Sequence, residues 1–153
     1  MPTIDQVLMQ EALKLAHEAA KKDEVPVGAV ITHNNKVIAR AHNQVEMLKD
    51  STAHAEMIAI TQASNYLSSK WLSECTIYVT IEPCAMCTGA LILARIKRLC
   101  FGATDPKTGA CGSVINLAQH PQLNHHIEIQ KNILTDECGV VLSQFFQKKR
   151  KQI

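Results

Sequence analysis

The chain has 153 residues, 46% of them hydrophobic and 20% charged, with a formal net charge of +2. This composition excludes a disordered chain, and the length predicts a single domain over residues 1–153 that can bury a proper core. No apolar run reaches the roughly 18–20 residues of a membrane span, and the N-terminal region lacks the apolar core of a secretory signal, so we expect no membrane partner and a cytoplasmic location.

The first part of the chain predicts a helix followed by a β-hairpin. Thr3 fits the N-cap position of a capping box, and apolar residues then recur at helical spacing over residues 4–21. Residues 25–32 and 36–42 are rich in β-branched side chains and flank the turn-prone sequence His-Asn-Asn. They predict two paired strands, and Asn43 follows where a loop should begin.

The rest of the chain alternates between helices and strands. Strands interleaved with helices indicate a layered α/β domain with helices on both faces of the sheet. The predicted elements are a helix over about 53–66, a strand over 75–81, a helix from Pro83 to about 95, a strand over 98–102, a loop over 104–112, a strand over 127–130 and a helix over 135–150.

Two short segments carry residues that suggest chemistry. Residues 52–56 read Thr-Ala-His-Ala-Glu, and residues 83–87 read Pro-Cys-Ala-Met-Cys. His54, Cys84 and Cys87 offer the three protein ligands of a catalytic zinc site, in which the fourth position is kept for water. In the first turn of a helix, cysteines three residues apart point to the same side, and the positive end of the helix dipole favours thiolates. The sequence therefore predicts one zinc ion per chain.

Glu56 is the candidate catalytic residue of this site. A carboxylate that is not a ligand can accept a proton from a metal-activated water and pass it on. Helical spacing alone does not direct Glu56 toward the same point as His54, because residues i and i+2 lie about 200° apart at 3.6 residues per turn. The assignment depends on the motif, since His-x-Glu with Pro-Cys-x-x-Cys is the signature of zinc nucleobase deaminases.

Two other interpretations of the cysteines stay open. A Cys-x-x-Cys pair alone can be a redox pair, although a redox pair more typically follows a strand in a thioredoxin-like pattern without a preceding proline. A structural zinc site would need a fourth protein ligand. The four remaining cysteines have no close second partner in the sequence, so we expect them to be small buried hydrophobic residues. They are Cys75, Cys100, Cys111 and Cys138.

With these motifs, the chain resembles the cytidine-deaminase-like superfamily and, more closely, the bacterial tRNA-specific adenosine deaminases. The resemblance extends from the segment Glu-Val-Pro-Val-Gly-Ala-Val at residues 24–30 to the C-terminal helix. The segments that favour the tRNA enzymes over other deaminases are residues 101–110, 120–125 and 136–146 with the basic tail behind them. The resemblance implies a three-layer α/β/α fold with a central mixed sheet of about five strands, a homodimer, and the tRNA anticodon stem-loop as partner.

The resemblance also implies the reaction. It is the hydrolytic deamination of adenosine to inosine at the wobble position of a tRNA anticodon, by zinc-bound hydroxide attacking C6 with Glu56 as proton shuttle. The base has to leave any stack to reach the metal, which is easier in an anticodon loop than in a duplex.

Substrate-binding roles follow from the same resemblance. Asn43 would hydrogen-bond the adenine, with a loop-capping role as the alternative, and Val27 would form part of an apolar wall. Asp105 and Lys107 match positions that meet the anticodon loop, Asp105 near a ribose hydroxyl that only RNA has.

The final helix would complete the contact with RNA. Phe145 and Phe146 would stack near the loop, while Lys149 and Arg150 would meet phosphate groups. A pair of phenylalanines on an amphipathic helix is more often core, so we expect at least one of them to be buried, and a basic run is most often a solvated helix end.

Two rival functions stay open. One is a deaminase of the same superfamily that acts on free guanine or cytosine compounds. The other is a zinc or RNA-binding module without catalytic activity, which would keep all its function if Glu56 were replaced.

Overall fold

A mixed sheet of five strands forms the centre of the computed structural model, which describes residues 1–152. The strand order is β2-β1-β3-β4-β5; β1 is antiparallel to both its neighbours, and β3, β4 and β5 run parallel. The strands are β1 (Gly28–His33), β2 (Lys36–His42), β3 (Cys75–Ile81), β4 (Arg98–Ala103) and β5 (Glu128–Gln130). The predicted mixed sheet of about five strands is confirmed.

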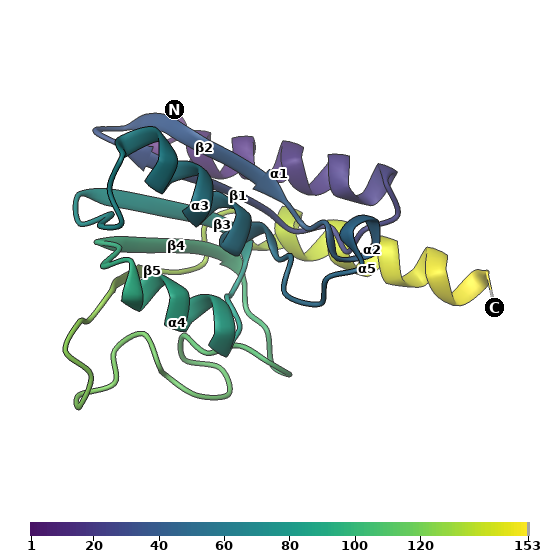
Figure 1. Ribbon diagram of the computed structural model, residues 1–153. Helices are drawn as coiled ribbons and strands as arrows, with labels where there is room; N and C mark the ends of the chain where they lie inside the picture. The colour runs from purple at the N-terminus through teal and green to yellow at the C-terminus, as the bar shows by residue number, and fades with distance from the viewer. Residues whose placement is uncertain (153) are drawn as a thin grey trace.

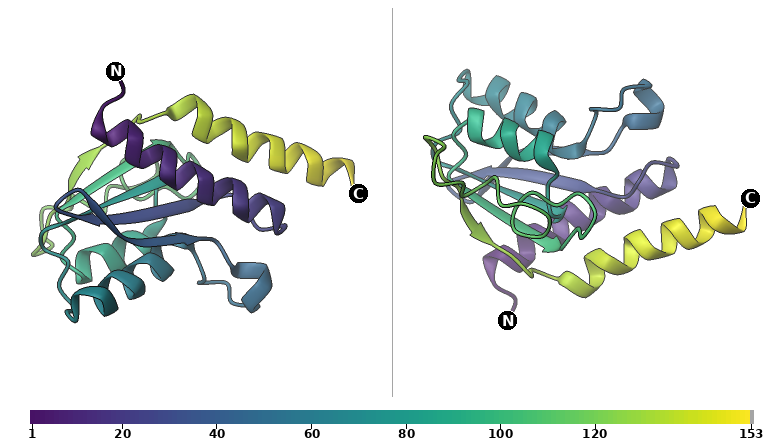
Figure 2. Two further views of the ribbon diagram at one scale, coloured as in Figure 1. Left: turned by 90° about the horizontal axis from the view of Figure 1, so that it is seen from above. Right: turned by 90° about the horizontal axis from the view of Figure 1, so that it is seen from below.

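Helices cover both faces of this sheet, which gives three layers (Figures 1 and 2). Helices α1 (Ile4–Lys21) and α5 (Thr135–Lys151) lie side by side on one face. Helices α3 (Ala55–Leu67) and α4 (Ala85–Leu93) lie together on the other, and the short helix α2 (Val45–Leu48) lies between β2 and α3 in the chain. Within residues 1–152, every helix is too short or too polar to span a lipid bilayer.

Alternation along the strands divides the interior into two hydrophobic cores. Successive side chains of a strand point to opposite faces of the sheet. On β3, Ile77 and Val79 pack against the α3–α4 layer, whereas Tyr78 packs against the α1–α5 layer. On β1, Ile31 and Val30 divide in the same way. Every one of these side chains is at most 1% exposed, so the sheet is buried on both faces.

The helix of the first layer approaches the sheet closely at one glycine. A Cβ atom at Gly28 would collide with the backbone carbonyl oxygen of Ala12, so only glycine lets α1 lie this near to β1. Thr3 caps α1 as predicted: its hydroxyl accepts from the Gln6 amide and the Gln6 side chain accepts from the Thr3 amide.

Several elements differ from the sequence prediction, and most of the differences are shifts of one or two residues at an end. β1 begins at Gly28 rather than at residue 25, because the segment before it turns, with the Val27 amide donating to the Val25 carbonyl at 2.9 Å. α2 was not predicted. Helices α3 and α4 begin at Ala55 and Ala85, about two residues later than predicted, so His54 and Cys84 are the N-cap residues.

Candidate active site

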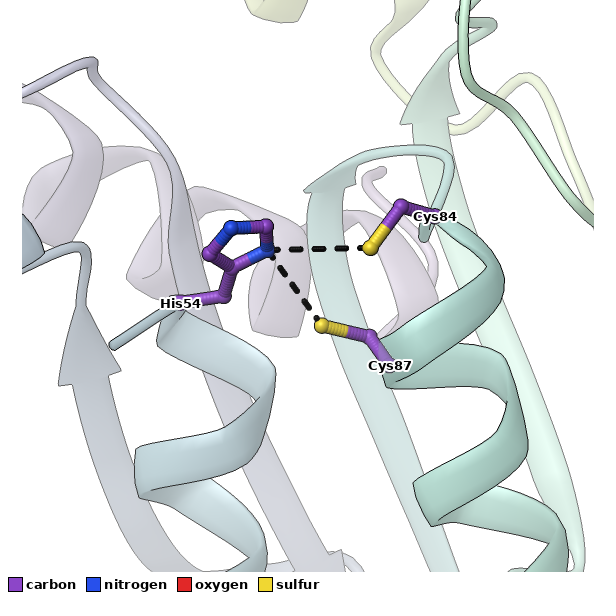
Figure 3. Close-up of side chains that lie close together, drawn as sticks. All are labelled: His54, Cys84 and Cys87. Carbon is purple, nitrogen blue, oxygen red and sulfur yellow. Dashed lines mark hydrogen bonds between the residues drawn. The ribbon is translucent and has the colours of Figure 1, made fainter. Parts of the chain in front are cut away.

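The N-terminal ends of α3 and α4 bring the candidate metal ligands together (Figure 3). His54 is the N-cap of α3, with φ −75° and ψ 150°, and Cys84 is the N-cap of α4, with φ −74° and ψ 178°. N-cap residues have extended backbones, so their side chains leave the helix axis and turn toward the space beyond the helix end. Cys87, in the first turn of α4, points to the same space.

The three side chains form a compact donor set. His54 Nδ1 lies 3.7 Å from Cys84 Sγ and 3.5 Å from Cys87 Sγ, and the three atoms lie within 4.8 Å of one another. Bond lengths of about 2.0–2.1 Å to nitrogen and about 2.3 Å to sulfur at a tetrahedral zinc ion place such atoms about 3.6 Å apart. One imidazole and two thiols with these separations therefore fit a zinc ion.

The donor set contains three protein residues and no fourth. Among residues 1–152, no other histidine, cysteine, aspartate or glutamate joins this group. Residues 1–152 therefore offer no fourth protein ligand of these types to support the interpretation as a structural zinc site. The other four cysteines are unpaired and buried, as predicted, and Cys111 lies beside the Thr88 hydroxyl at 3.4 Å.

Charge in the donor set favours a thiolate. The neighbouring Cys87 thiol, followed by His54, lowers the pKa of Cys84 to about 4. The hydrogen bond to Cys84, followed by burial, raises the pKa of Cys87, so the metal-free pair holds one proton. A bound cation would remove that proton, because metal ligation requires both thiolates.

Glu56 lies in the same cavity as His54, although the helical repeat does not predict this. Because His54 precedes the first helical residue, the angle of about 200° between positions i and i+2 does not apply to this pair. Glu56 is only 3% exposed and lines the same cavity as His54 and Cys84. Burial is the main cause that raises the pKa of Glu56 from its ordinary 4.5 to about 7.

A cavity of about 590 Å³ opens over this group. Eight of the twelve predicted site residues line it, whereas Cys87 lies buried behind it and three residues of α5 do not reach it. The eight are Val27, Asn43, His54, Glu56, Cys84, Asp105, Lys107 and Phe146. The three are Phe145, Lys149 and Arg150.

Asn43 serves both as a cap and as part of the cavity wall. Its Oδ1 accepts a hydrogen bond of 2.8 Å from the Ala55 amide, at the start of α3. The side-chain amide is thereby oriented, because its oxygen is engaged and its NH₂ group is the part left for the cavity. His42 Nδ1 lies 2.9 Å from the Asn43 carbonyl oxygen and helps to fix the backbone there.

One face of α5 closes the cavity, and a neighbouring face is tied into the fold. Leu142 and Phe146 line the cavity. Phe145 is half-buried and meets Phe146 edge to face, with ring centroids 5.4 Å apart. Lys149 pairs with Asp23 at 2.5 Å and lies 5.7 Å from the Phe145 ring. Phe146 is therefore the aromatic residue of α5 that the cavity presents.

Two buried carboxylates at the cavity were absent from the predicted site. Glu24 is 2% exposed and accepts from the amides of Glu46 and Met47 at 2.9 and 2.7 Å. Glu82 is also 2% exposed and accepts from the segment that follows β4. The sequence held one signal for Glu82, an acidic residue between an apolar strand and the Pro-Cys pair.

Comparison with known proteins is consistent across sequence and structure. Residues 4–150 match the family described as MafB19-like deaminase. The chain is 47% identical to a tRNA-specific adenosine deaminase of Bacillus subtilis over 98% of this chain and 93% of that protein. It is also 47% identical to a tRNA-specific adenosine deaminase of Aquifex aeolicus, with 95% of each chain covered.

Solved structures extend the comparison to three dimensions. A structure from studies of A-to-I editing by tRNA:A34 deaminases at the wobble position of transfer RNA superposes with a TM-score of 0.86 and 40% identity, over 89% of this chain and 99% of that one. A guanine deaminase from Nitrosomonas europaea has a TM-score of 0.76 at 24% identity, over 92% of this chain and 83% of that one. The second likeness shows a shared fold alone.

Proposed function

We propose that this chain, which belongs to the family of tRNA-specific adenosine deaminases, hydrolyses adenosine to inosine at the wobble position of a tRNA anticodon. The observation that carries the proposal is one cavity that contains the His54, Cys84 and Cys87 donor set, the buried Glu56 carboxyl and the Asn43 amide. The relatives that are named for this activity match nearly the whole chain.

The donor set would hold one zinc ion per chain through His54 Nδ1, Cys84 Sγ and Cys87 Sγ. When bound, zinc supplies a water molecule whose pKa is lowered toward neutrality. The chain contributes the thiolate charge, the low exposure of the site and two helix N-termini that favour negative groups.

Glu56 would carry the proton. In the metal-free protein burial raises the pKa of its carboxyl group to about 7, and a buried carboxyl group of this kind can accept and release a proton near neutral pH. Glu56 takes a proton from the attacking water and delivers it to N1 of adenine as the C6–oxygen bond forms. It then takes the second proton from the new C6 hydroxyl and gives it to the amino group as the C6–nitrogen bond breaks. Adenosine and water thereby become inosine and ammonia.

Asn43 and Val27 would hold the base. The free NH₂ group of Asn43 can donate to an acceptor nitrogen of the purine, and Val27, 6% exposed, offers an apolar surface to its ring. A flipped-out base is held in this way by edge hydrogen bonds and apolar contact.

The rim of the cavity would contact the anticodon loop. Asp105, Lys107 and Phe146 line the cavity, so we assign to them contacts with the nucleotide and its neighbours. Phe145 would support Phe146 from the side, and the basic end of α5 would meet phosphate groups. The basic residues of that end are Lys148, Lys149, Arg150 and Lys151.

We further propose a homodimer in the cytoplasm. Leu93, Val114 and Ile115 are exposed by 78%, 53% and 49%, and these are apolar side chains that a second subunit would cover. All six cysteines are free thiols, which suits a reducing compartment. Light scattering during gel filtration would measure the mass in solution, and a monomer at micromolar concentration would contradict the dimer.

The proposed reaction has a direct assay. Zinc-loaded protein should convert the wobble adenosine of an anticodon stem-loop transcript to inosine, detected after nuclease digestion by mass spectrometry. A transcript with guanosine at that position is the matched control. Ammonia release from free guanine or cytosine compounds with an inert transcript would favour the small-molecule rival, and binding without product would favour the non-enzymatic one.

A further inference from the structure

Glu82 connects the metal-binding helix to the loop that forms one wall of the cavity. It follows β3 directly and precedes Cys84 by two residues. The loop in question is residues 104–113, which follows β4 and which we call the wall loop. The backbone of Glu82 donates to the Ala103 carbonyl at 2.8 Å, and the Ala110 amide donates to the Pro83 carbonyl at 2.9 Å.

The Glu82 carboxylate is occupied by the wall loop. Oε1 accepts from the Asp105 amide at 3.1 Å and from the Ser113 hydroxyl. Oε2 accepts from the amides of Cys111 and Ser113 at 3.0 and 3.1 Å. A Cβ atom at Gly109 would collide with the carboxyl group, so the loop wraps closely around it. Both oxygens are used, and no free lone pair is left for a metal or a substrate.

The first half of the wall loop lines the cavity. Asp105, Lys107 and Thr108 line the cavity together with His54 and Glu56. The Asp105 carboxylate accepts from the Lys107 and Thr108 amides at 3.0 and 3.1 Å, and from the Thr108 hydroxyl at 2.7 Å, which closes a tight turn at the tip. Glu82 holds one end of that turn through the Asp105 amide.

We propose that Glu82 is a positioning residue that sets substrate affinity, by fixing the wall loop at a defined distance from the metal-binding helix. The inference rests on the proposed function, because the wall loop is assigned there to the anticodon nucleotide. Glu82 itself contacts neither substrate nor the reacting atoms. Its loss should therefore weaken substrate binding while the metal ligands and Glu56, which α3 and α4 hold, keep their places.

The test separates KM from kcat in the zinc-loaded full chain, with the anticodon stem-loop as substrate. Glu82→Gln keeps the shape but replaces one carboxylate oxygen by an NH₂ group, which faces amide donors that it cannot accept from. The expected result is a KM raised about tenfold, a kcat within about threefold of wild type and one zinc ion per chain. Glu82→Asp keeps both acceptors and should recover part of the KM.

Two further variants make the outcome decisive. Asp5→Asn also alters a hydrogen-bonded carboxylate, but one between α1 and the sheet, and should leave KM unchanged. Ser113→Ala removes one donor side chain and should raise KM about threefold. If Glu82→Gln does not fold, Ser113→Ala decides the matter, and an unchanged KM overturns the proposal.

Hydrogen exchange gives a second readout. Amides of residues 105–113 should exchange faster in Glu82→Gln, while those of α3 and α4 keep the wild-type rate. An unchanged KM, a loss of kcat alone, or a loss of zinc would each overturn the positioning role. Failure of wild-type protein to form inosine would instead overturn the proposed function, so the two failures are distinguishable.

Discussion

Carboxyl groups in two regions of this molecule are held in opposite states. Between α1 and the sheet, Asp5 accepts hydrogen bonds from both terminal nitrogens of Arg98 at 3.0 and 2.7 Å and from the Tyr78 hydroxyl at 2.7 Å. The Arg98 hydrogen bonds are the main cause that lowers the pKa of Asp5. In the cavity, burial outweighs the groups that favour a charge, and the pKa of Glu56 rises to about 7.

The difference in pKa distinguishes a carboxylate that stabilises the fold, Asp5, from a carboxyl group that is suited to proton transfer, Glu56. A carboxylate held ionised by a guanidinium fixes two elements together but cannot exchange protons near neutral pH. A buried carboxyl group with a pKa near the working pH destabilises its surroundings and suits proton transfer. A variant at Glu56 should therefore change turnover without lowering the free energy of unfolding, and a variant at Asp5 should do the reverse.

The largest expected effect is at the metal ligands. Cys87→Ala should lose zinc and lower inosine formation by about a thousandfold or more, because the chain then offers two ligands instead of three. Metal analysis and the transcript assay measure both effects. Cys100→Ala is the matched control, since this thiol is equally buried but lies in the α1–α5 core, and it should keep zinc and turnover. A Cys87→Ala protein with stoichiometric zinc would contradict the donor set.

The next largest effect is on the free energy of unfolding when Glu56 is replaced. Glu56→Gln should stabilise the chelator-treated, metal-free protein by roughly 3 kcal/mol above pH 7, since each pKa unit corresponds to about 1.4 kcal/mol. The folded pKa of about 7 lies above the ordinary 4.5, so wild-type stability falls as pH rises through this window and the gain disappears below pH 4.5. Urea unfolding at pH 4 and pH 8 measures the difference. A variant less stable than wild type at pH 8 would contradict the prediction, because it would mean that neighbouring groups stabilise the ionised Glu56 carboxylate in the folded protein.

The α1 contact should behave in the opposite way. Asp5→Asn should destabilise the fold by about 2 kcal/mol at pH 7, because it removes a partly buried ion pair with Arg98. The folded pKa lies below the ordinary 3.8, so the stabilisation is present above that value and is lost as pH falls through the folded pKa. The same urea series extended to acid measures it. The kcat should be unchanged. A variant with wild-type stability but lower kcat would contradict the assignment of Asp5 to the fold and not to the reaction.

The smallest effect separates the two phenylalanines of α5. Phe146→Ala should raise KM for the transcript about fivefold, since stacking on a base contributes about 1–3 kcal/mol at most, and Phe146 is the one that lines the cavity. Phe145→Ala should change KM less and is the matched control on the adjacent position. Equal increases in KM would mean that both rings meet RNA.

The strands were predicted well from the sequence, because runs of β-branched and apolar residues coincide with the segments that are buried in the sheet. The run of β-branched residues over residues 75–81 matches β3 residue for residue, and the paired asparagines at 34 and 35 adopt the positive φ angles of 53° and 60° that a tight hairpin turn requires. α1 was also predicted to the residue, since its capping box and apolar periodicity coincide.

The members of the candidate donor set were predicted from the sequence motifs, but the way they come together in the structure could not be. The helical repeat separates His54 from Glu56. The conflict is resolved only because α3 begins at Ala55 instead of about residue 53, which makes His54 the N-cap. The acceptors Glu24 and Glu82 were missed for another reason. Most of their partners are backbone amides of segments distant in the sequence, α2 for Glu24 and the wall loop for Glu82, and a backbone N–H is present at every residue except proline, so it gives no sequence signal.

The central claim is that the Glu56 carboxyl, beside a zinc ion held by one imidazole and two thiolates, carries the proton of a hydrolytic deamination. Single-turnover inosine formation by Glu56→Gln, measured together with zinc content, tests it most directly. We expect about one zinc ion per chain and a rate lower by about 10²–10⁴-fold, the usual contribution of a general acid–base. A zinc-loaded variant that forms inosine at the wild-type rate would contradict the claim.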